Sequence, residues 1–233
     1  MARLSDYNAK RDFGRTSEPR GRIGKSKSHR FVIQRHDATR LHYDFRLELD
    51  GVYKSWAVTK VPSLDPATKR LAVEVEDHPL DYGTFEGIIP EGEYGGGTVQ
   101  LWDRGTWKSQ TGTPERDLER GQLKIELNGK RLKGGWALVR MRDDPRKPGR
   151  KVRHNWLLIK ERDDDARPGE PDTLLDEDTS VKTGRTLEEI ADKSRSVWHS
   201  NKAKTTTKRV ATARKVRAPA KKKNRARKKR KSA

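Results

Sequence analysis

The clearest hydrophobic pattern in the chain is a strict alternation over residues 41–49, LHYDFRLEL. Apolar side chains occupy the odd positions of this segment, and His42, Asp44, Arg46 and Glu48 occupy the even ones. Successive side chains of a β-strand point to opposite faces, so the segment predicts a strand with one apolar and one polar face. The Asp50-Gly51 pair that follows predicts a tight hairpin to the next strand.

A second alternating segment covers residues 71–78, LAVEVEDH. Its period of two predicts another strand with two unlike faces. The expected apolar face is Leu71, Val73 and Val75, and the expected polar face is Glu74, Glu76 and His78.

Shorter β-branched and aromatic segments, bounded by turn formers, predict six further strands. They are residues 30–35, 55–60, 98–102, 122–127, 136–141 and 156–160. The pair Asn128-Gly129 predicts the turn after the fourth of these. Short strands joined by tight turns favour a mainly β fold, a small antiparallel barrel or sandwich whose apolar faces close on each other. We expect a barrel of about eight strands with short flanking helices and with its polar faces outward.

Charge divides the chain into parts. The net charge is +20, yet residues 201–233 hold 16 of the 54 basic residues and no acid, and residues 31–200 carry 29 basic against 31 acidic residues. The sequence therefore predicts a basic N-terminal arm over residues 1–30, a barrel domain over 31–163, an acidic loop and short helix over 164–200, and a disordered basic tail over 201–233. Thr186 and Glu189 form a capping-box pattern that predicts a helix over 186–193.

Several classes of protein and site are excluded or disfavoured by what the sequence lacks. The absence of cysteine excludes disulfides, thiolate metal sites and cysteine nucleophiles. No segment approaches the roughly 18 apolar residues that span a bilayer, and the N-terminus has no apolar secretory signal. We therefore expect a cytoplasmic protein with no membrane partner. We also expect a monomer that is associated with the nucleoid.

The polar face of residues 41–49 carries the best candidates for chemistry. His42 and Asp44 are two residues apart, which places both side chains on one face with their Cα atoms about 6.5 to 7 Å apart. With His36 upstream they form H-x5-H-x-D, a donor set that suits a divalent metal with positions left open. Arg46 continues the same face, and a guanidinium beside a metal suits a phosphate. The alternative is that an exposed strand simply carries polar residues, and the spacing alone leaves both interpretations open.

Other motifs in the sequence give weaker evidence of a function. The glycine-rich stretch 86–97 lacks the phosphate-binding P-loop form, so it is interpreted as a turn-rich loop. Tryptophans on strand patterns are more often core residues, although Trp102 or Trp107 could stack a nucleobase.

The tail mixes lysine and arginine with Ala, Thr and Pro and lacks an amphipathic aromatic stripe, which favours contacts to nucleic-acid phosphates over a membrane surface. The candidate nucleic-acid-binding residues there are Lys221, Lys222, Lys223, Arg225, Arg227, Lys228, Lys229, Arg230 and Lys231.

Two long segments, FVIQRHDATRLHYDFRLELDGVYKSWAVTK and KRLAVEVEDHPLDYGTFEGIIPEGEYGGGTVQLWDRGTW, strongly resemble the 3′-phosphoesterase domain of bacterial DNA ligase D. The upstream KRDFGRTSEP also fits that family, and the resemblance covers roughly residues 7–161. Since the chain length leaves no room for the polymerase and ligase modules of the full-length enzyme, the resemblance predicts a stand-alone form.

The resemblance implies a manganese-dependent enzyme of non-homologous end joining that acts on DNA 3′ ends. It would remove a terminal ribonucleoside and then the 3′-phosphate, leaving a 3′-OH, and Ku or a separate ligase or polymerase are possible partners. Carried over position by position, the metal ligands match His36, His42 and Asp44. The phosphate-contacting and catalytic residues match Arg46, Lys60, Arg70, Glu76, His78 and Tyr82, and the N-terminal functional residues match Arg11, Asp12 and Glu18.

Three roles follow as expectations from this resemblance. The N-terminal arm should fold over the site, and Glu76 and Asp12 should orient Arg70 or Arg11. His78 is the candidate general acid or, alternatively, a hydrogen-bond donor to the transition state. The rival functions are a non-catalytic DNA-binding or architectural protein and a general endonuclease.

Overall fold

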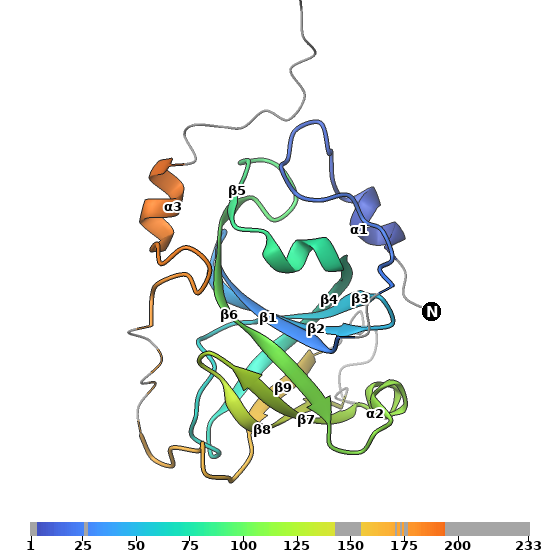
Figure 1. The fold of residues 1–233 in the computed structure, drawn as a ribbon, viewed down its shortest axis with the longest axis vertical. Helices are drawn as coiled ribbons and strands as arrows, with labels where there is room; N and C mark the ends of the chain where they lie inside the picture. The colour runs from blue at the N-terminus through green and yellow to red at the C-terminus, as the bar shows by residue number, and fades with distance from the viewer. Residues whose placement is uncertain are drawn as a thin grey trace, which may run out of the picture. The chain divides into compact units, whose positions relative to one another are not determined.

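The structure is a computed structural model that describes residues 4–25, 28–142, 155–170, 172, 174 and 177–193. Within these residues the chain forms nine strands, three short α-helices and one 3-10 helix (Figure 1). The strands are β1 (Arg30–Asp37), β2 (Leu41–Leu49), β3 (Val52–Val58), β4 (Lys69–Pro79), β5 (Gly87–Ile89), β6 (Gly97–Ser109), β7 (Gln122–Gly129), β8 (Lys133–Arg140) and β9 (Asn155–Lys160). The helices are α1 (Ser5–Ala9), η1 (Leu80–Thr84), α2 (Pro114–Arg120) and α3 (Leu187–Lys193).

Eight of the strands close into an antiparallel barrel, which confirms the predicted fold class. The strand order is β1-β2-β3-β4-β9-β8-β7-β6, and β6 pairs back onto β1 to close the barrel, while β5 adds to the start of β6. Closure removes the exposed sheet edges that a flat sheet of this size would leave. All eight predicted strand segments lie within or overlap these strands, and β5 was missed because its three residues lie in the glycine-rich stretch.

The barrel interior is filled by the apolar faces of the strands. Aromatic side chains dominate it: Phe45, Trp56, Trp136 and Trp156 are each 1% exposed or less. Fully burying an apolar side chain of this kind contributes roughly 1.5–3 kcal/mol, so this core is the main stabilising term. Trp102 and Trp107 belong to the same cluster, which corrects the suggestion that either could stack a nucleobase.

The turns confirm one hairpin prediction and correct another. Asp50 and Gly51 both have positive φ, as the predicted tight hairpin between β2 and β3 requires. Asn128 and Gly129, in contrast, are the last paired residues of β7, and the chain turns over residues 130–132 instead. The turn moves because the buried Asp103 carboxylate accepts the backbone N–H groups of Lys130, Arg131 and Leu132 at 2.8–3.1 Å.

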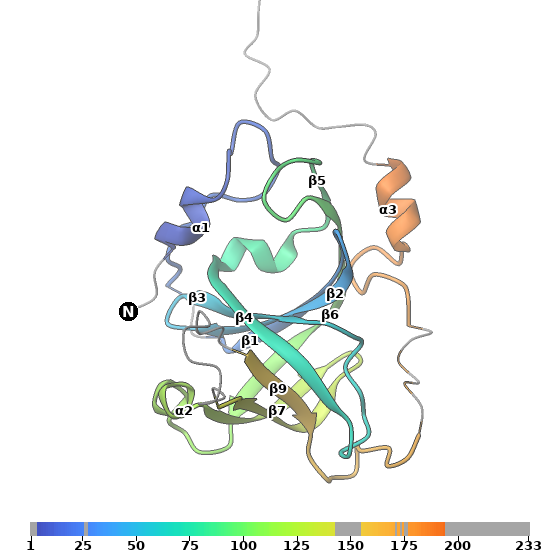
Figure 2. The same ribbon diagram turned by 180° about the vertical axis from the view of Figure 1, so that it is seen from behind.

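The polar face of β2 points outward from the barrel, as predicted, but a second layer covers it. Asp44, Arg46 and Glu48 point away from the barrel interior but are only 6%, 2% and 2% exposed. Both views of the fold place α1, η1 and β5 on one side of the barrel (Figures 1 and 2). Tyr7 and Tyr82 from this layer pack together in a small hydrophobic cluster of their own. The polar face of β2 therefore lies in a buried seam between two layers.

Strand β4 departs from its predicted alternation. Ala72, in place of Leu71, packs into the barrel core, and Leu71 is 36% exposed. Near its end, Tyr53 pairs with His78 and Ser55 pairs with Val75, so Glu76 and Asp77 lie opposite the single residue Lys54. This is a β-bulge, which adds one residue to one strand and redirects the side chains beyond it.

The remaining elements include one predicted helix. The helix expected at 186–193 is α3, and its capping box is present: Glu189 accepts the Thr186 backbone N–H at 3.1 Å, and Thr186 Oγ1 accepts the Glu189 backbone N–H at 3.3 Å. Helices α1, η1 and α2 were not predicted. Segments of five to seven residues carry almost no helical period, and these three have no side-chain cap like that of α3. No helix among the described residues is long and apolar enough to cross a membrane.

Candidate metal and phosphate site

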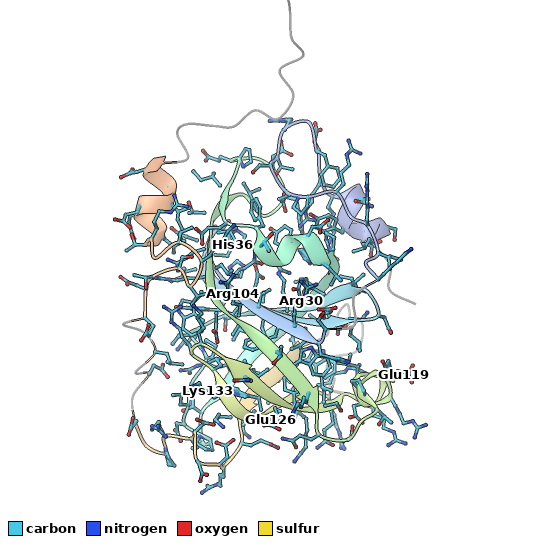
Figure 3. The ribbon with its side chains drawn as sticks, in the orientation of Figure 1. Arg30, His36, Arg104, Glu119, Glu126 and Lys133 are labelled. Atoms are coloured by element: carbon cyan, nitrogen blue, oxygen red, sulfur yellow. The ribbon has the colours of Figure 1, made fainter. Side chains whose placement is uncertain are left out.

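The three predicted metal ligands come together on the covered face of β1 and β2. His36 and His42 are direct cross-strand partners, with ring centroids 4.7 Å apart. Asp44 lies between them: its carboxylate is 3.4 Å from His36 Nδ1 and 3.7 Å from His42 Nε2. Figure 3 shows His36 on the side of the barrel that carries β5. The strand pairing brings together residues that are up to eight positions apart in the chain.

The far side of each imidazole is held by a backbone carbonyl. His36 Nε2 lies 2.9 Å from the Gly95 carbonyl, and His42 Nδ1 lies 2.8 Å from the Arg40 carbonyl. A carbonyl oxygen only accepts, so the proton of each neutral ring is on the nitrogen that faces it, and the other nitrogen presents a lone pair. Metal-binding histidines usually donate their second ring N–H to a carbonyl or carboxylate in this way.

The donor set fits a divalent metal ion. One ligand atom from each of His36, His42 and Asp44 can be chosen so that all three lie within 4.8 Å of one another. Two imidazole nitrogens and a carboxylate oxygen suit divalent ions such as manganese or zinc. His36, His42 and Asp44, called the metal trio below, are therefore able to hold such an ion.

Arg46 joins this trio to a network of its own. Its Nη2 is 3.1 Å from the Asp44 carboxylate, and its Nε donates to Gln34 Oε1 at 2.8 Å. Its Nη1 is buried and has no hydrogen-bond partner among the residues that the structure describes. A buried N–H group without a partner costs about 1–3 kcal/mol, which a phosphate oxygen would recover.

The electrostatics keep Asp44 ionised. Burial opposes ionisation of its carboxyl group, but the Arg46 guanidinium and the two imidazoles outweigh burial and lower the pKa of Asp44 below its usual value. The carboxylate is therefore available as a negatively charged ligand over the whole physiological pH range.

The N-terminal arm contributes a second, buried guanidinium. Arg11 donates from Nε to Glu18 at 2.8 Å and from Nη1 to Glu76 at 3.2 Å, and its guanidinium lies 3.8 Å from the centre of the Tyr7 ring. Thr16 in turn donates to Glu18 at 2.9 Å. The pair of carboxylates holds Arg11 against the barrel face.

His78 and Tyr82 lie next to Arg11. His78 Nδ1 donates to the Glu76 carbonyl at 2.8 Å, and its Nε2 lies 3.3 Å from Arg11 Nη2. Burial, Arg46 and Arg11 together lower the pKa of His78 well below its usual value, so the ring is neutral. Tyr82 stacks edge-on against His78 and lies beneath the Arg46 guanidinium, 4.9 Å from it.

Three expected residues lie elsewhere or make other contacts. Arg70 donates to the Val61 carbonyl and pairs with Asp172, and Glu76 therefore orients Arg11 and not Arg70. Asp12 accepts from Gly14 in a local turn of the arm and makes no ion pair with Arg11 that the structure records. Lys60 is exposed just beyond the end of β3.

Sequence reasoning missed three residues of this region. Gln34 shares the face of His36 through the same period of two, and its side-chain amide donates to the carbonyls of Tyr82 and Phe85, so this signal was present in the sequence. Lys10 and Tyr94 both contact Glu76, at 2.9 and 3.3 Å. They come from the arm and the glycine-rich loop, and no local pattern relates these two segments. The candidate nucleic-acid-binding residues of the tail lie outside the described residues.

Comparison with known proteins finds that residues 34–140 are similar to a known family. The family description that matches residues 34–140 is "DNA Ligase D 3'-phosphoesterase domain". The Multifunctional non-homologous end joining protein LigD of Pseudomonas aeruginosa is 57% identical over 140 residues, 59% of this chain and 16% of that protein.

Two further relatives extend this similarity across genera. The Multifunctional non-homologous end joining DNA repair protein LigD of Mycobacterium tuberculosis strain H37Rv is 44% identical over 144 residues, 61% of this chain and 19% of that protein. The Multifunctional non-homologous end joining protein LigD of Mycolicibacterium smegmatis is 40% identical over 147 residues, 60% of this chain and 19% of that protein. The chain thus spans less than a fifth of the length of these relatives. Residues 34–140, which contain the metal trio, Arg46, Glu76 and His78, match the DNA ligase D 3′-phosphoesterase domain family.

Proposed function

We propose that the protein is a manganese-dependent phosphoesterase that heals DNA 3′ ends in non-homologous end joining. It would remove a 3′-terminal ribonucleoside and the 3′-phosphate to leave a 3′-OH. The observation that carries this proposal is the arrangement of Arg46. One of its nitrogens holds the metal trio through Asp44, and another is buried without a partner among the described residues, beside the place where a bound phosphate would lie.

Each group of the site has a role in this proposal. His36, His42 and Asp44 would hold Mn²⁺, which supplies Lewis acidity toward the scissile phosphate. Arg46 binds the phosphate oxygens and stabilises the charge that develops on them, and Arg11 adds a second guanidinium. Glu18 and Glu76 orient Arg11, and the second layer over the barrel excludes water from the buried side of the site. Exposed Lys60 and the more distant Arg70 would contact the DNA strand or support the loop after β3.

His78 would position the Arg11 guanidinium. Because its proton is on Nδ1 and its Nε2 accepts from Arg11, the neutral ring has no N–H directed at a leaving oxygen. This favours holding Arg11 over either donating a proton as a general acid or donating a hydrogen bond to the transition state. Tyr82 packs against both the His78 imidazole and the Arg46 guanidinium and holds these two groups in place.

The test is end processing by the purified protein. A primer–template with a 3′-phosphate, or with one 3′-ribonucleotide, is incubated with Mn²⁺ and resolved on a denaturing gel. We expect conversion to a 3′-OH end, and loss of conversion in EDTA. His42→Ala should reduce the rate at least about 100-fold, because it removes one metal ligand while leaving the barrel core intact.

His29→Asn serves as the matched control. His29 is exposed at the far end of β1 and has positive φ, which asparagine tolerates. This variant should retain full activity. Full activity of a well-folded His42→Ala protein would show that the metal trio is not the site.

Two rival functions give different results in the same assay. A DNA-binding or architectural protein would leave both 3′ ends unchanged with any divalent metal. A general endonuclease would also cut supercoiled circular DNA, which has no ends, whereas the proposed enzyme would not.

The protein would act at DNA breaks together with other repair proteins. The substrates would be DNA ends in the nucleoid, and Ku or a separate ligase or polymerase would act on the same break. The relatives' names refer to non-homologous end joining, which supports this setting.

A further inference from the structure

The glycine-rich loop between β5 and β6 carries an aromatic side chain at the rim of the site. Tyr94 lies one residue before Gly95, whose carbonyl accepts from His36 at 2.9 Å. Gly95 has a φ of 76°, a left-handed conformation that glycine adopts without strain and that directs this carbonyl toward the imidazole. The loop thus places Tyr94 next to a metal ligand.

Hydrogen bonds at the hydroxyl and cations over the ring hold Tyr94 against the arm. Its hydroxyl donates to Glu76 Oε2 at 3.3 Å, the same carboxylate that holds Arg11. Lys10 Nζ lies over the ring, 4.6 Å from its centre. Lys10 also donates to the Tyr94 hydroxyl at 3.3 Å, and the Arg11 guanidinium lies 5.5 Å from the ring centre. The ring is therefore held beside both of these cations.

Tyr94 is nevertheless open to solvent. It is 46% exposed, and it is the only aromatic among the large hydrophobic side chains that are exposed in the described part of the chain. The tryptophans considered for base stacking, Trp102 and Trp107, are 0% and 1% exposed and unavailable. The fold therefore keeps this aromatic ring in contact with solvent, although its burial would stabilise the protein.

We propose that Tyr94 stacks on the base of the 3′-terminal nucleoside and so selects a nucleic-acid end as the substrate. This inference rests on the proposed function, because it takes the scissile phosphate to be bound at Arg46 and the metal trio. The base lies one sugar away from that phosphate, and Tyr94 adjoins Gly95, whose carbonyl contacts His36. Stacking on an aromatic ring tolerates any base, as a break end of arbitrary sequence requires.

A purely structural role for Tyr94 predicts something different. If the ring serves only to tie Lys10 and the arm to the loop, its loss weakens every substrate equally. If it stacks on a base, its loss matters only when the substrate has a base at that position. A pair of substrates that differ in this base therefore separates the two roles.

The experiment uses two primer–templates with a 3′-phosphate, one with a normal terminal nucleoside and one with a tetrahydrofuran abasic residue in its place. Tyr94→Leu removes the ring, and Tyr94→Phe keeps the ring but removes the hydroxyl with its hydrogen bonds to Glu76 and Lys10. We expect Tyr94→Leu to lower kcat/KM about ten-fold on the normal end, mostly through KM, and less than two-fold on the abasic end. Tyr94→Phe should behave like the unmodified protein in its preference for the end with a base.

The same comparison is made by equilibrium binding in EDTA, with fluorescence anisotropy at about 0.2 M salt to suppress binding to phosphates alone. The unmodified protein and Tyr94→Phe should bind the normal end more tightly than the abasic end, and Tyr94→Leu should bind both alike. Equal losses on the two ends, or no loss on either, would overturn the stacking proposal. If the unmodified protein converts neither end with Mn²⁺, the proposed function fails, and the binding comparison in EDTA still decides the role of Tyr94.

Discussion

His78 shows how a single side chain changes character when the fold closes around it. In the sequence it is one of a few histidines on a polar strand face, with an ordinary pKa near 6.5. In the structure it is 4% exposed, between the rings of Tyr7 and Tyr82 and next to the Arg11 and Arg46 guanidiniums. Burial and two positive charges oppose its protonation, which is why a positioning role fits it better than that of a general acid.

This burial predicts a pH dependence of stability. Above pH about 6.5 both the folded and the unfolded protein hold His78 neutral, so it contributes nothing. Below that pH the unfolded chain binds a proton that the folded chain does not, and the free energy of unfolding falls by about 1.4 kcal/mol per pH unit from this residue. His78→Gln removes the effect. Urea unfolding of the metal-free proteins at pH 7.5 and 5.5 should show the difference between the two shifting by about 1.4 kcal/mol in favour of the variant at the lower pH. A difference that is the same at both pH values would contradict this account.

At the residue scale, the local sequence correctly predicted which side chains share one face of a single strand. The period of two put His42, Asp44 and Arg46 on one face, and the structure has them there. It was not informative for Arg70 and Glu76, whose partners are set by segments far away in the chain. Arg70 pairs with Asp172, about a hundred residues further along, and no spacing rule predicts such a pair.

At the element scale, the bulge in β4 decides which residues reach the site. Regular alternation would keep Glu76 on the same face as Glu74, whose carboxylate accepts from Trp156 Nε1 at 2.9 Å. The extra residue opposite Lys54 turns Glu76 and His78 toward Arg11 instead. A bulge was not predicted, because it depends on how β3 and β4 pair and not on the pattern of β4 alone.

Deleting Asp77 tests this element. With one residue removed, β4 can pair regularly with β3, which turns the Glu76 carboxylate away from Lys10 and Arg11. We expect the barrel to remain folded by circular dichroism, the arm to become several-fold more sensitive to trypsin at Lys10 and Arg11, and end processing to be lost.

Asp77→Ala is the matched control for the deletion. It removes the ion pair with Lys54 but keeps the residue count, so the arm should stay as protected as in the unmodified protein. Equal protection of the arm in the deletion and in the alanine variant would show that the bulge does not hold it.

At the scale of the whole molecule, the charge is divided between different tasks. Of the net charge of +20, the 16 basic residues beyond position 200 account for most, and the barrel region is nearly neutral. The charges that build the site are few and mostly paired: Arg46 with Asp44, and Arg11 with Glu18 and Glu76. The excess beyond position 200 remains a prediction for phosphate contacts that read no sequence.

Removing residues 201–233 should weaken binding to any DNA and flatten its salt dependence, because each neutralised phosphate contributes about 0.9 to the slope of log K against log salt. The reaction rate at saturating DNA should change little, since the site lies elsewhere in the chain. A second variant, with the nine basic residues of 221–231 replaced by glutamine, keeps the length and removes the charge. An unchanged slope in both variants would show that the tail makes no DNA contact.

The sequence by itself determined the class of fold, eight strand positions and the face that carries the metal trio, since alternation is a local property of one strand. Tertiary structure alone decided that this face is buried, that Arg11 and Tyr94 from two other segments meet at Glu76, and that His78 is neutral. These features arise where the second layer closes over the barrel, and the pKa, orientation and partners of a buried polar group depend on every segment packed around it.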